Sequence, residues 1–426
     1  MRSLGDRLRA VLGDQVRAPA RARATAEVDV AGVAGVLGGR WHDVDGARFL
    51  VVDHTYHPDH RYGRFRVADA VPPGGWPRLP LLAQRASGPD GALFVDLETT
   101  GLAGGAGTYA FLVGCGWFAD DAFHVRQFFL SSFVAERHLL AAVDELAAGA
   151  TTIVTYNGKT FDVPLLETRC VMHRMPAPFE AMPHVDLLHP ARRLWRGPDE
   201  GCRLGMLERV LFGLERTGDV PGIEIPARYF DYVHGGDATA LVPVLEHNRL
   251  DLLSLAMVTA HTMRLLDGGA AAASTSREAL GIGRLYERAG MVDEALDCFV
   301  RAARMGGGPT AEALRAEAVL CRRLRRHEQA ARAWQRLLEQ PGCGARAVRE
   351  AAEALAVYHE HRRRDPGAAR SFAVRSLQMD GSPARRLAGQ YRLARLDRKL
   401  GQAAAGGVPL LRMARVPSVR RPASAD

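Results

Sequence analysis

Two acidic residues in the stretch DLETTGL raise the first chemical question of this sequence. Asp96 and Glu98 are two positions apart in an apolar strand pattern, residues 91–98, so both side chains would lie on one face of the strand. Carboxylates this close repel each other, and burying them without a partner is costly. Either the strand lies at a solvated edge, or a cation lies between the two acids.

Two further stretches carry side chains of matching chemistry. In YNGKTFD, Asn157 ends a strand pattern and Asp162 falls in the first turn of the following helix pattern. In HNRLD, His247 and Asp251 are i and i+4 within a long helix pattern, so both lie on one helix face. The chain therefore offers four carboxylates and one imidazole on elements that an α/β sheet can bring together at its strand ends.

This set of residue types favours a particular metal chemistry. Carboxylate oxygens without thiolates favour Mg²⁺ or Mn²⁺ over zinc. Such a set can hold two ions about 4 Å apart, where one ion activates an attacking water and the other stabilises the leaving 3′ oxygen. An imidazole can accept the proton of the water near neutral pH. The chemistry indicated is hydrolysis of a phosphodiester bond.

The elements that would position these residues follow an α/β pattern from residue 91 onward. Three successive strands are predicted, followed by a helix ending at Gly149, a buried strand, a second helix, a short strand, an amphipathic helix and a long helix. Their ranges are 91–98, 108–118, 123–130, 135–149, 151–157, 161–174, 184–188, 202–213 and 238–266. Three antiparallel strands, a helix, a strand and a helix in this order are typical of the ribonuclease-H-like fold.

Taken together, DLETTGL, YNGKTFD and HNRLD resemble the three motifs of the DEDD exonucleases. The chain resembles the YprB-like bacterial family, which joins such a domain to a tetratricopeptide-repeat tail, and the resemblance covers residues 88–400. It implies a metal-dependent 3′–5′ exonuclease that hydrolyses DNA, with a role in DNA repair beside a helicase partner. It also implies that two Mg²⁺ or Mn²⁺ ions bind to Asp96, Glu98, Asp162 and Asp251, with His247 as the general base.

The third motif departs from the family pattern in its spacing. One branch of these exonucleases has His-x4-Asp and another has Tyr-x3-Asp, whereas this chain has His247-x3-Asp251. The histidine thus stands at the helical position of the tyrosine. We expect it to act as a base, because the i, i+4 geometry is kept.

Substrate contacts are expected around the first motif and in a loop over the cleft. The family binds the terminal nucleotide just after the first acids, and a leucine can wedge beneath that base, although core packing is the alternative for this leucine. The residues 217–230 resemble the cleft loop. The candidate substrate-binding residues are Thr99, Thr100, Leu102, Asn157, Arg228 and Tyr229. Asp186 competes with Asp162 for the second motif, but it follows the helix, and we expect it to be structural.

The back third of the chain changes character. An Ala-x3-aromatic element occurs at Ala295/Phe299, recurs 35 residues on at Ala330/Trp334 and again 38 further at Ala368/Phe372. Such a period resembles tetratricopeptide repeats, with ordinary helical hairpins as the alternative. We expect helical repeats over 277–400, which would bind a protein partner, and a disordered basic tail over 401–426.

The front of the chain, residues 1–87, is expected to be an N-terminal extension with short strands and a Pro/Gly-rich linker at 72–80. We expect its strands to form an extra sheet packed on the exonuclease domain, residues 88–268. The extension begins with an Arg-rich stretch that lacks the apolar core of a signal peptide.

Composition narrows the class of protein. The chain of 426 residues is 47% hydrophobic, has no apolar run of membrane-spanning length, and has six widely spaced cysteines without a C-x-x-C pair. These features exclude a disulfide framework and a zinc cluster and indicate a cytoplasmic protein. Residues 277–426 hold 29 basic and 16 acidic residues, against 27 and 32 in residues 1–276. A basic back third suits contact with a polyanion.

Two competing functions remain open from sequence. An inactive adaptor would bind nucleic acid or a partner without cleaving, but such a protein would be expected to lack carboxylates, and none is missing here. An RNA-processing exonuclease would differ by a contact to the 2′-hydroxyl, which a sequence does not reveal.

Overall fold

In a computed structural model, the chain forms two compact units, residues up to Gly268 and from Gly269 onward. The structure describes residues 30–71, 75–83, 91–101, 107–196, 201–379 and 382–404. In this part of the chain no helix is long and apolar enough to span a membrane.

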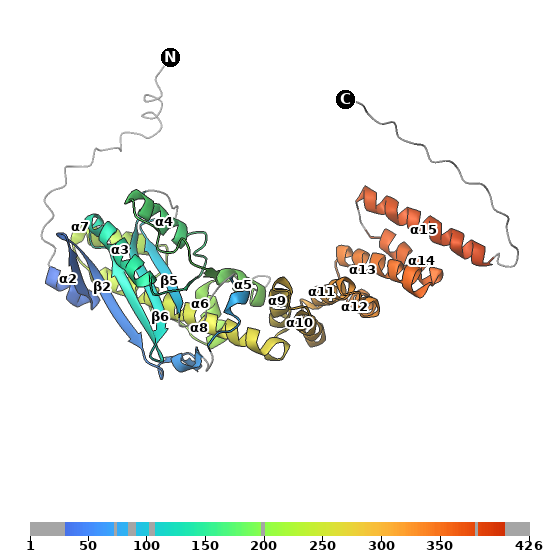
Figure 1. The fold of residues 1–426 in the computed structure, drawn as a ribbon, viewed down its shortest axis with the longest axis horizontal. Helices are drawn as coiled ribbons and strands as arrows, with labels where there is room; N and C mark the ends of the chain where they lie inside the picture. The colour runs from blue at the N-terminus through green and yellow to red at the C-terminus, as the bar shows by residue number, and fades with distance from the viewer. Residues whose placement is uncertain are drawn as a thin grey trace, which may run out of the picture. The chain divides into compact units, whose positions relative to one another are not determined.

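A seven-stranded sheet forms the centre of the first unit (Figure 1). Its strand order is β1-β2-β7-β6-β5-β8-β9. The strands are β1 (Arg40–Val44), β2 (Ala47–Tyr56), β5 (Ala92–Thr99), β6 (Ala110–Ala119), β7 (Ala122–Phe129), β8 (Thr152–Thr155) and β9 (His184–Asp186). Neighbours from β1 to β5 pair antiparallel, whereas β5, β8 and β9 run parallel. A separate hairpin pairs β3 (Arg61–Tyr62) with β4 (Phe65–Arg66).

The N-terminal strands correct one expectation from sequence. The strands β1 and β2 do not form an extra sheet, because β2 pairs with β7 over seven residue pairs and so extends the central sheet at its edge. Among the described strands, only β3 and β4 form a separate, two-stranded sheet. The pairing also places an ion pair between Arg126 of β7 and Asp53 of β2, 2.6 Å apart.

Helices pack against this sheet and connect its strands. They are α2 (Val30–Leu37), α3 (Glu136–Ala147), α4 (Asp162–Met172), α5 (Leu188–Leu194), α6 (Leu204–Leu207), α7 (Ile225–Gly235) and α8 (Val242–Ala272). The apolar faces of α2, α3, α4 and α7 and the start of α8 form one core with the sheet; Leu139 of α3 and Tyr229 of α7 are fully buried in it. The backbone of α8 departs from helical geometry at Gly269, where φ is 54°, and this break coincides with the boundary between the units.

The second unit is all helical. It consists of α9 (Ser276–Arg288), α10 (Val292–Met305), α11 (Thr310–Arg323), α12 (His327–Glu339), α13 (Ala345–Tyr358), α14 (Pro366–Leu377) and α15 (Pro383–Ala404), with a π-helical turn at His359–Arg363. Consecutive helices pack on each other. Gly283 of α9 lies so close to Phe299 of α10 that a Cβ would come within 2.6 Å of the ring.

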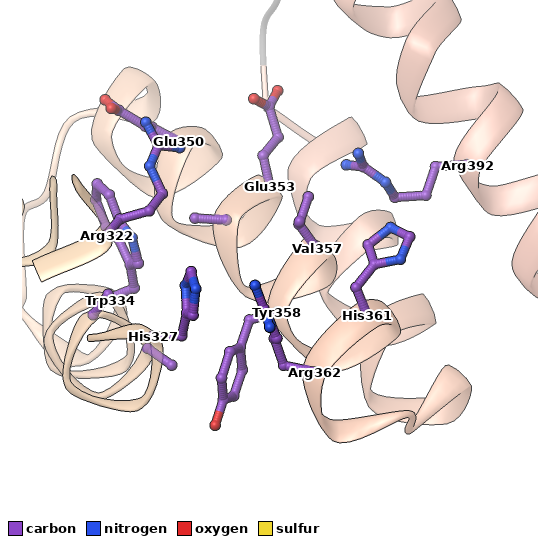
Figure 2. Close-up of a pocket in the computed structure, with 13 residues that line it drawn as sticks. Arg322, His327, Trp334, Glu350, Glu353, Val357, Tyr358, His361, Arg362 and Arg392 are labelled. Atoms are coloured by element: carbon purple, nitrogen blue, oxygen red, sulfur yellow. The ribbon is translucent and has the colours of Figure 1, made fainter. Parts of the chain in front are cut away.

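A pocket of about 430 Å³ opens in this unit between α12, α13 and α15 (Figure 2). Trp334 and Tyr358 contribute aromatic surface to it, and Arg322 and Arg362 contribute positive charge. Neither of these two guanidinium groups has an ion-pair partner among the described residues. The pocket thus combines apolar walls with charged groups of both signs, because Glu350 and Glu353 line it as well (Figure 2).

Candidate functional site

The acids of β5 lie on the face of the sheet that α8 covers. Leu93, Val95 and Leu97 alternate with them and enter the hydrophobic core on the opposite face. Asp96 is paired with Gly114 of β6, and a Cβ at this glycine would lie 2.3 Å from the side-chain oxygen of Asn248. Only a residue without a side chain leaves room for α8 to approach the acids this closely.

Asn248 joins the helix of the third motif to the strand of the first. Its side-chain nitrogen donates to the backbone oxygen of Asp96 at 3.1 Å and to the Asp96 carboxylate at 2.8 Å. Asn248 is fully buried, and its own oxygen accepts from Gln127 Nε2 at 2.8 Å. A satisfied buried network of this kind fixes the relative position of the elements that it joins. It therefore places His247 and Asp251 beside β5.

The other three expected carboxylates lie within electrostatic reach of Asp96. Burial raises the pKa of Asp96 well above its usual range, and the charges of Asp251, Glu98 and Asp162 raise it further. Burial likewise raises the pKa of Glu98, with Asp251 and Asp162 adding to the effect. Burial, followed by the charge of Asp186, raises the pKa of Asp162 to about 7. These carboxylates thus repel one another.

The donor set fits divalent metal ions, although the side chains do not form a closed site as they stand. Among the described residues, no three His, Cys, Asp or Glu side chains converge closely enough to hold an ion. One oxygen of Asp251 is instead 2.5 Å from Nη2 of Arg216. Because carboxylate oxygens are the ligands that Mg²⁺ and Mn²⁺ prefer, and because the charge here is in excess, the cluster suits such ions.

The imidazole of His247 lies between two carboxylates. Its Nδ1 is 2.6 Å from Oδ1 of Asp219, and its Nε2 is 3.8 Å from Oδ2 of Asp251. The second distance is too long for a hydrogen bond, so Nε2 remains open toward the acid cluster. The i, i+4 placement on one face of α8 is as expected from sequence.

Arg216 and Asp219 are site residues that the sequence motifs do not indicate. Arg216 is largely buried and binds Glu208, Asp219 and Asp251 together. Glu208, only 1% exposed, also accepts from Ser254. Burial lowers the pKa of Arg216, but the carboxylates of Glu208 and Asp251 outweigh this effect and raise it overall. One signal was available, since Glu208 stands within a strongly apolar helix pattern, where a buried acid requires a cation.

The hydroxyl groups of Thr99 and Thr100 form local hydrogen bonds. Oγ1 of Thr99 donates to the backbone oxygen of Gly101 at 2.9 Å, and Oγ1 of Thr100 accepts from the backbone nitrogen of Tyr109 at 2.9 Å. Thr100 thereby holds the end of β5 beside the start of β6, whereas the bond of Thr99 stays within the turn that follows β5. Leu102 lies outside the described residues.

Asn157 and Asp186 together shape the turn that carries Asp162. Asn157 adopts a left-handed backbone conformation with φ of 70°. Its backbone nitrogen donates to Asp186 Oδ1 at 2.8 Å, and the nitrogens of Lys159 and Leu188 donate to the same carboxylate at 3.1 Å each. Asp186 is thus occupied with backbone donors, in keeping with the structural role expected for it.

Tyr229 is a correction to the expected substrate contacts. It is fully buried, its ring is stacked on Phe111 with centroids 4.1 Å apart, and its hydroxyl donates to the backbone oxygen of Leu130. The residues from Ile225 form helix α7 and not a loop over the cleft, and Tyr229 is on the inner face of this helix. Arg228 is on its outer side, where it pairs with Glu224 at 3.3 Å.

Comparison with known proteins identifies the family. Residues 93–263 match the model of the RNase_H superfamily. The chain is 32% identical over 317 residues to the uncharacterized protein YprB of Bacillus subtilis (strain 168). The aligned region covers 72% of this chain and 74% of that protein. The chain belongs to the YprB family. The expected ribonuclease-H-like domain followed by an all-helical region is confirmed, and the first unit has a fold of the nuclease type.

A weaker likeness exists among solved structures. The family B DNA polymerase of the hyperthermophilic archaeon Pyrobaculum calidifontis aligns with 46% of this chain and 29% of its own, at 13% identity and a TM-score of 0.32. An overlap of this extent carries no argument about substrate.

Proposed function

We propose that this protein is a metal-dependent nuclease of the DEDD type that hydrolyses phosphodiester bonds of DNA from the 3′ end. One observation carries the proposal: Asp162 of α4 and Asp251 of α8 both lie within electrostatic reach of the two acids of β5, Asp96 and Glu98. A fold gains nothing from gathering four repelling carboxylates unless a cation binds among them.

The residues have separate roles in this proposal. The four carboxylates would hold two Mg²⁺ or Mn²⁺ ions, which would supply activation of a water and stabilisation of the leaving oxygen. His247 accepts the proton of the attacking water at Nε2, the ring nitrogen that faces Asp251. Asn248 holds Asp96 in place, so that the strand and the helix keep their register. Thr99, Thr100 and Leu102, with Asn157 and Arg228, contribute to binding of the strand end.

The substrate and its context also belong to the proposal. We assign DNA in preference to RNA, and a role in DNA repair beside a helicase that supplies single-stranded ends. The helicase would dock on the second unit, whose helix pairs we assign to tetratricopeptide-like repeats. The pocket between α12, α13 and α15 is one concave feature of the described helices, and its Arg322 and Arg362 suit an acidic segment of the partner (Figure 2).

The docking assignment has a direct test. Arg322→Glu together with Arg362→Glu should weaken the affinity for the helicase at least tenfold, which corresponds to about 1.4 kcal/mol of binding free energy. Hydrolysis of free DNA should stay unchanged. Unchanged affinity for the helicase would remove the pocket from the proposal.

End protection tests the polarity and the nature of the substrate. A DNA strand with phosphorothioate linkages at its 3′ end should resist the full-length protein in Mn²⁺, whereas the same strand protected at its 5′ end should be degraded. An RNA strand of the same sequence should be degraded more slowly. Degradation of the 3′-protected strand would contradict the polarity, and faster cleavage of RNA would favour an RNA-processing enzyme.

A further inference from the structure

The segment 213–221 connects α7 to α6 and the π-helical turn Glu208–Phe212 that follows α6. It reaches the acids Asp96, Glu98, Asp162 and Asp251 with two charged side chains. Gly213 ends the preceding helix in a left-handed conformation with φ of 68°. The chain then turns back, and Val220 is buried in the core of the first unit, which anchors the far end of the segment. Arg216 and Asp219 lie between these two fixed points.

Arg216 is held by Glu208 and at the same time contacts Asp251 of the site. Its Nε donates to Oε2 of Glu208 at 2.9 Å, and Nη2 donates to Oδ1 of Asp251 at 2.5 Å. The side chains of Arg216 and Glu208 are 8% and 1% exposed. Because breaking a buried ion pair is unfavourable, this pair gives Arg216 little freedom. Asp251 therefore has one oxygen held by the guanidinium and the other directed toward His247.

Asp219 is fixed by two donors and contacts the imidazole. Its Oδ1 accepts from the backbone nitrogen of Val220 at 3.0 Å, and its Oδ2 is 3.4 Å from Nη1 of Arg216. The same Oδ1 is 2.6 Å from Nδ1 of His247. A carboxylate only accepts hydrogen bonds, so the short contact requires a proton on Nδ1. The neutral ring then has its lone pair on Nε2, the nitrogen that is open toward the acid cluster.

We propose that Asp219 is a positioning residue that fixes the tautomer and orientation of His247, with Arg216 holding Asp219 and Asp251 in register. The inference rests on the proposed function, since it gives His247 the role of base. It extends that function to two residues outside the three motifs. If Asp219 only stabilised the segment 213–221, the tautomer of His247 would not depend on the carboxylate of Asp219.

The test reads the ring directly and then the rate. The full-length, metal-free protein labelled with ¹⁵N-histidine is studied by long-range ¹H–¹⁵N NMR at mildly alkaline pH, with His247→Gln to assign the signal. The parent protein should show the Nδ1–H tautomer, and Asp219→Asn should lose it. In Mn²⁺, Asp219→Asn should lower kcat at least tenfold, with little change in KM, because a general base is worth about 10²- to 10⁴-fold. Asp219→Glu should recover part of the rate.

Glu224→Gln is the matched control. It removes one acidic charge from the same region, where Glu224 contacts Arg228 and not His247, so the tautomer and kcat should stay at the values of the parent protein. The positioning role is overturned if Asp219→Asn leaves the tautomer unchanged, whatever its rate. A fall in kcat equal in Asp219→Asn and Glu224→Gln would overturn it as well. If the parent protein cleaves no substrate, the proposed function fails, and the NMR result alone still decides the contact.

Discussion

Replacing Asp162 by asparagine should stabilise the metal-free protein at alkaline pH. Asp162 lies in the first turn of α4, and burial together with the charge of Asp186 raises its pKa from the usual 3.8 to about 7. Asparagine keeps the shape of the side chain and removes the charge. The change therefore relieves an electrostatic penalty that the carboxylate imposes on the folded state.

The magnitude follows from the raised pKa. The difference between 3.8 and about 7 corresponds to about 4 kcal/mol at a pH above both values, as an upper limit. A carboxylate at a helix N-terminus contributes about 0.3–1 kcal/mol that asparagine loses, and solvent screens part of the rest. We expect a net gain of about 2 kcal/mol, or roughly 4–8 °C in Tm.

The sign of the pH dependence follows from linkage. The folded state holds the proton of Asp162 more tightly than the unfolded state, so this residue lowers stability as the pH rises through the raised pKa. The advantage of asparagine should be full above about pH 7 and shrink steadily toward pH 4. Mn²⁺ binds the ionised carboxylates, so it should stabilise the parent protein more at pH 8 than at pH 6, because protons compete for Asp162 below its pKa of about 7.

Thermal unfolding with EDTA or with Mn²⁺ measures these effects. The control is Asp121→Asn, which removes an exposed charge from the turn between β6 and β7 of the same unit. In EDTA at pH 8, Asp162→Asn should have a higher Tm than the parent protein and than Asp121→Asn. Mn²⁺ should raise the Tm of Asp162→Asn less than it raises the Tm of the parent. Lower stability of Asp162→Asn than of the parent, or an undiminished effect of Mn²⁺, would refute the reasoning.

Two further changes test the support around the acids. Glu208→Gln leaves the largely buried Arg216 without its main partner, so urea unfolding should show a loss of about 3 kcal/mol; a loss below about 1 kcal/mol would mean that the pair does not anchor the segment. Gly114→Ala places a Cβ 2.3 Å from the oxygen of Asn248, which should displace its hydrogen bond to Asp96 and weaken Mn²⁺ binding about tenfold in calorimetry. Equal affinity for Mn²⁺ would show that Asn248 does not hold Asp96 for the metal.

Local patterns were sufficient to predict the parts of the site that lie within single elements. The alternation of β5 predicts that Asp96 and Glu98 share a face, and helical spacing predicts the same for His247 and Asp251. Both arrangements are present in the structure. These geometries depend only on the period of one strand or one helix, which the order of residues determines directly.

Contacts between distant segments were not accessible from such patterns. Arg216 is 35 positions from Asp251, and Asp219 is 28 positions from His247, so a charged loop gave no sign of either contact. The pairing of β2 with β7, which adds β1 and β2 to the edge of the sheet, likewise joins segments far apart in the sequence. Tyr229 is different, because Ile225, Tyr229 and Tyr232 follow helical spacing and are all buried. That pattern predicts a core position, and the expected loop contact was wrong.

Digestion of a 5′-labelled single-stranded DNA with Mn²⁺ or Mg²⁺ tests the central claim most directly, with Asp251→Ala beside the parent protein. The parent should give a ladder that shortens from the 3′ end, and the folded variant should give none, because it lacks a metal ligand. A variant that cleaves at the rate of the parent would contradict the assignment of the site. Absence of cleavage by the parent, on single- or double-stranded DNA or on RNA, would contradict the nuclease and favour a binding adaptor.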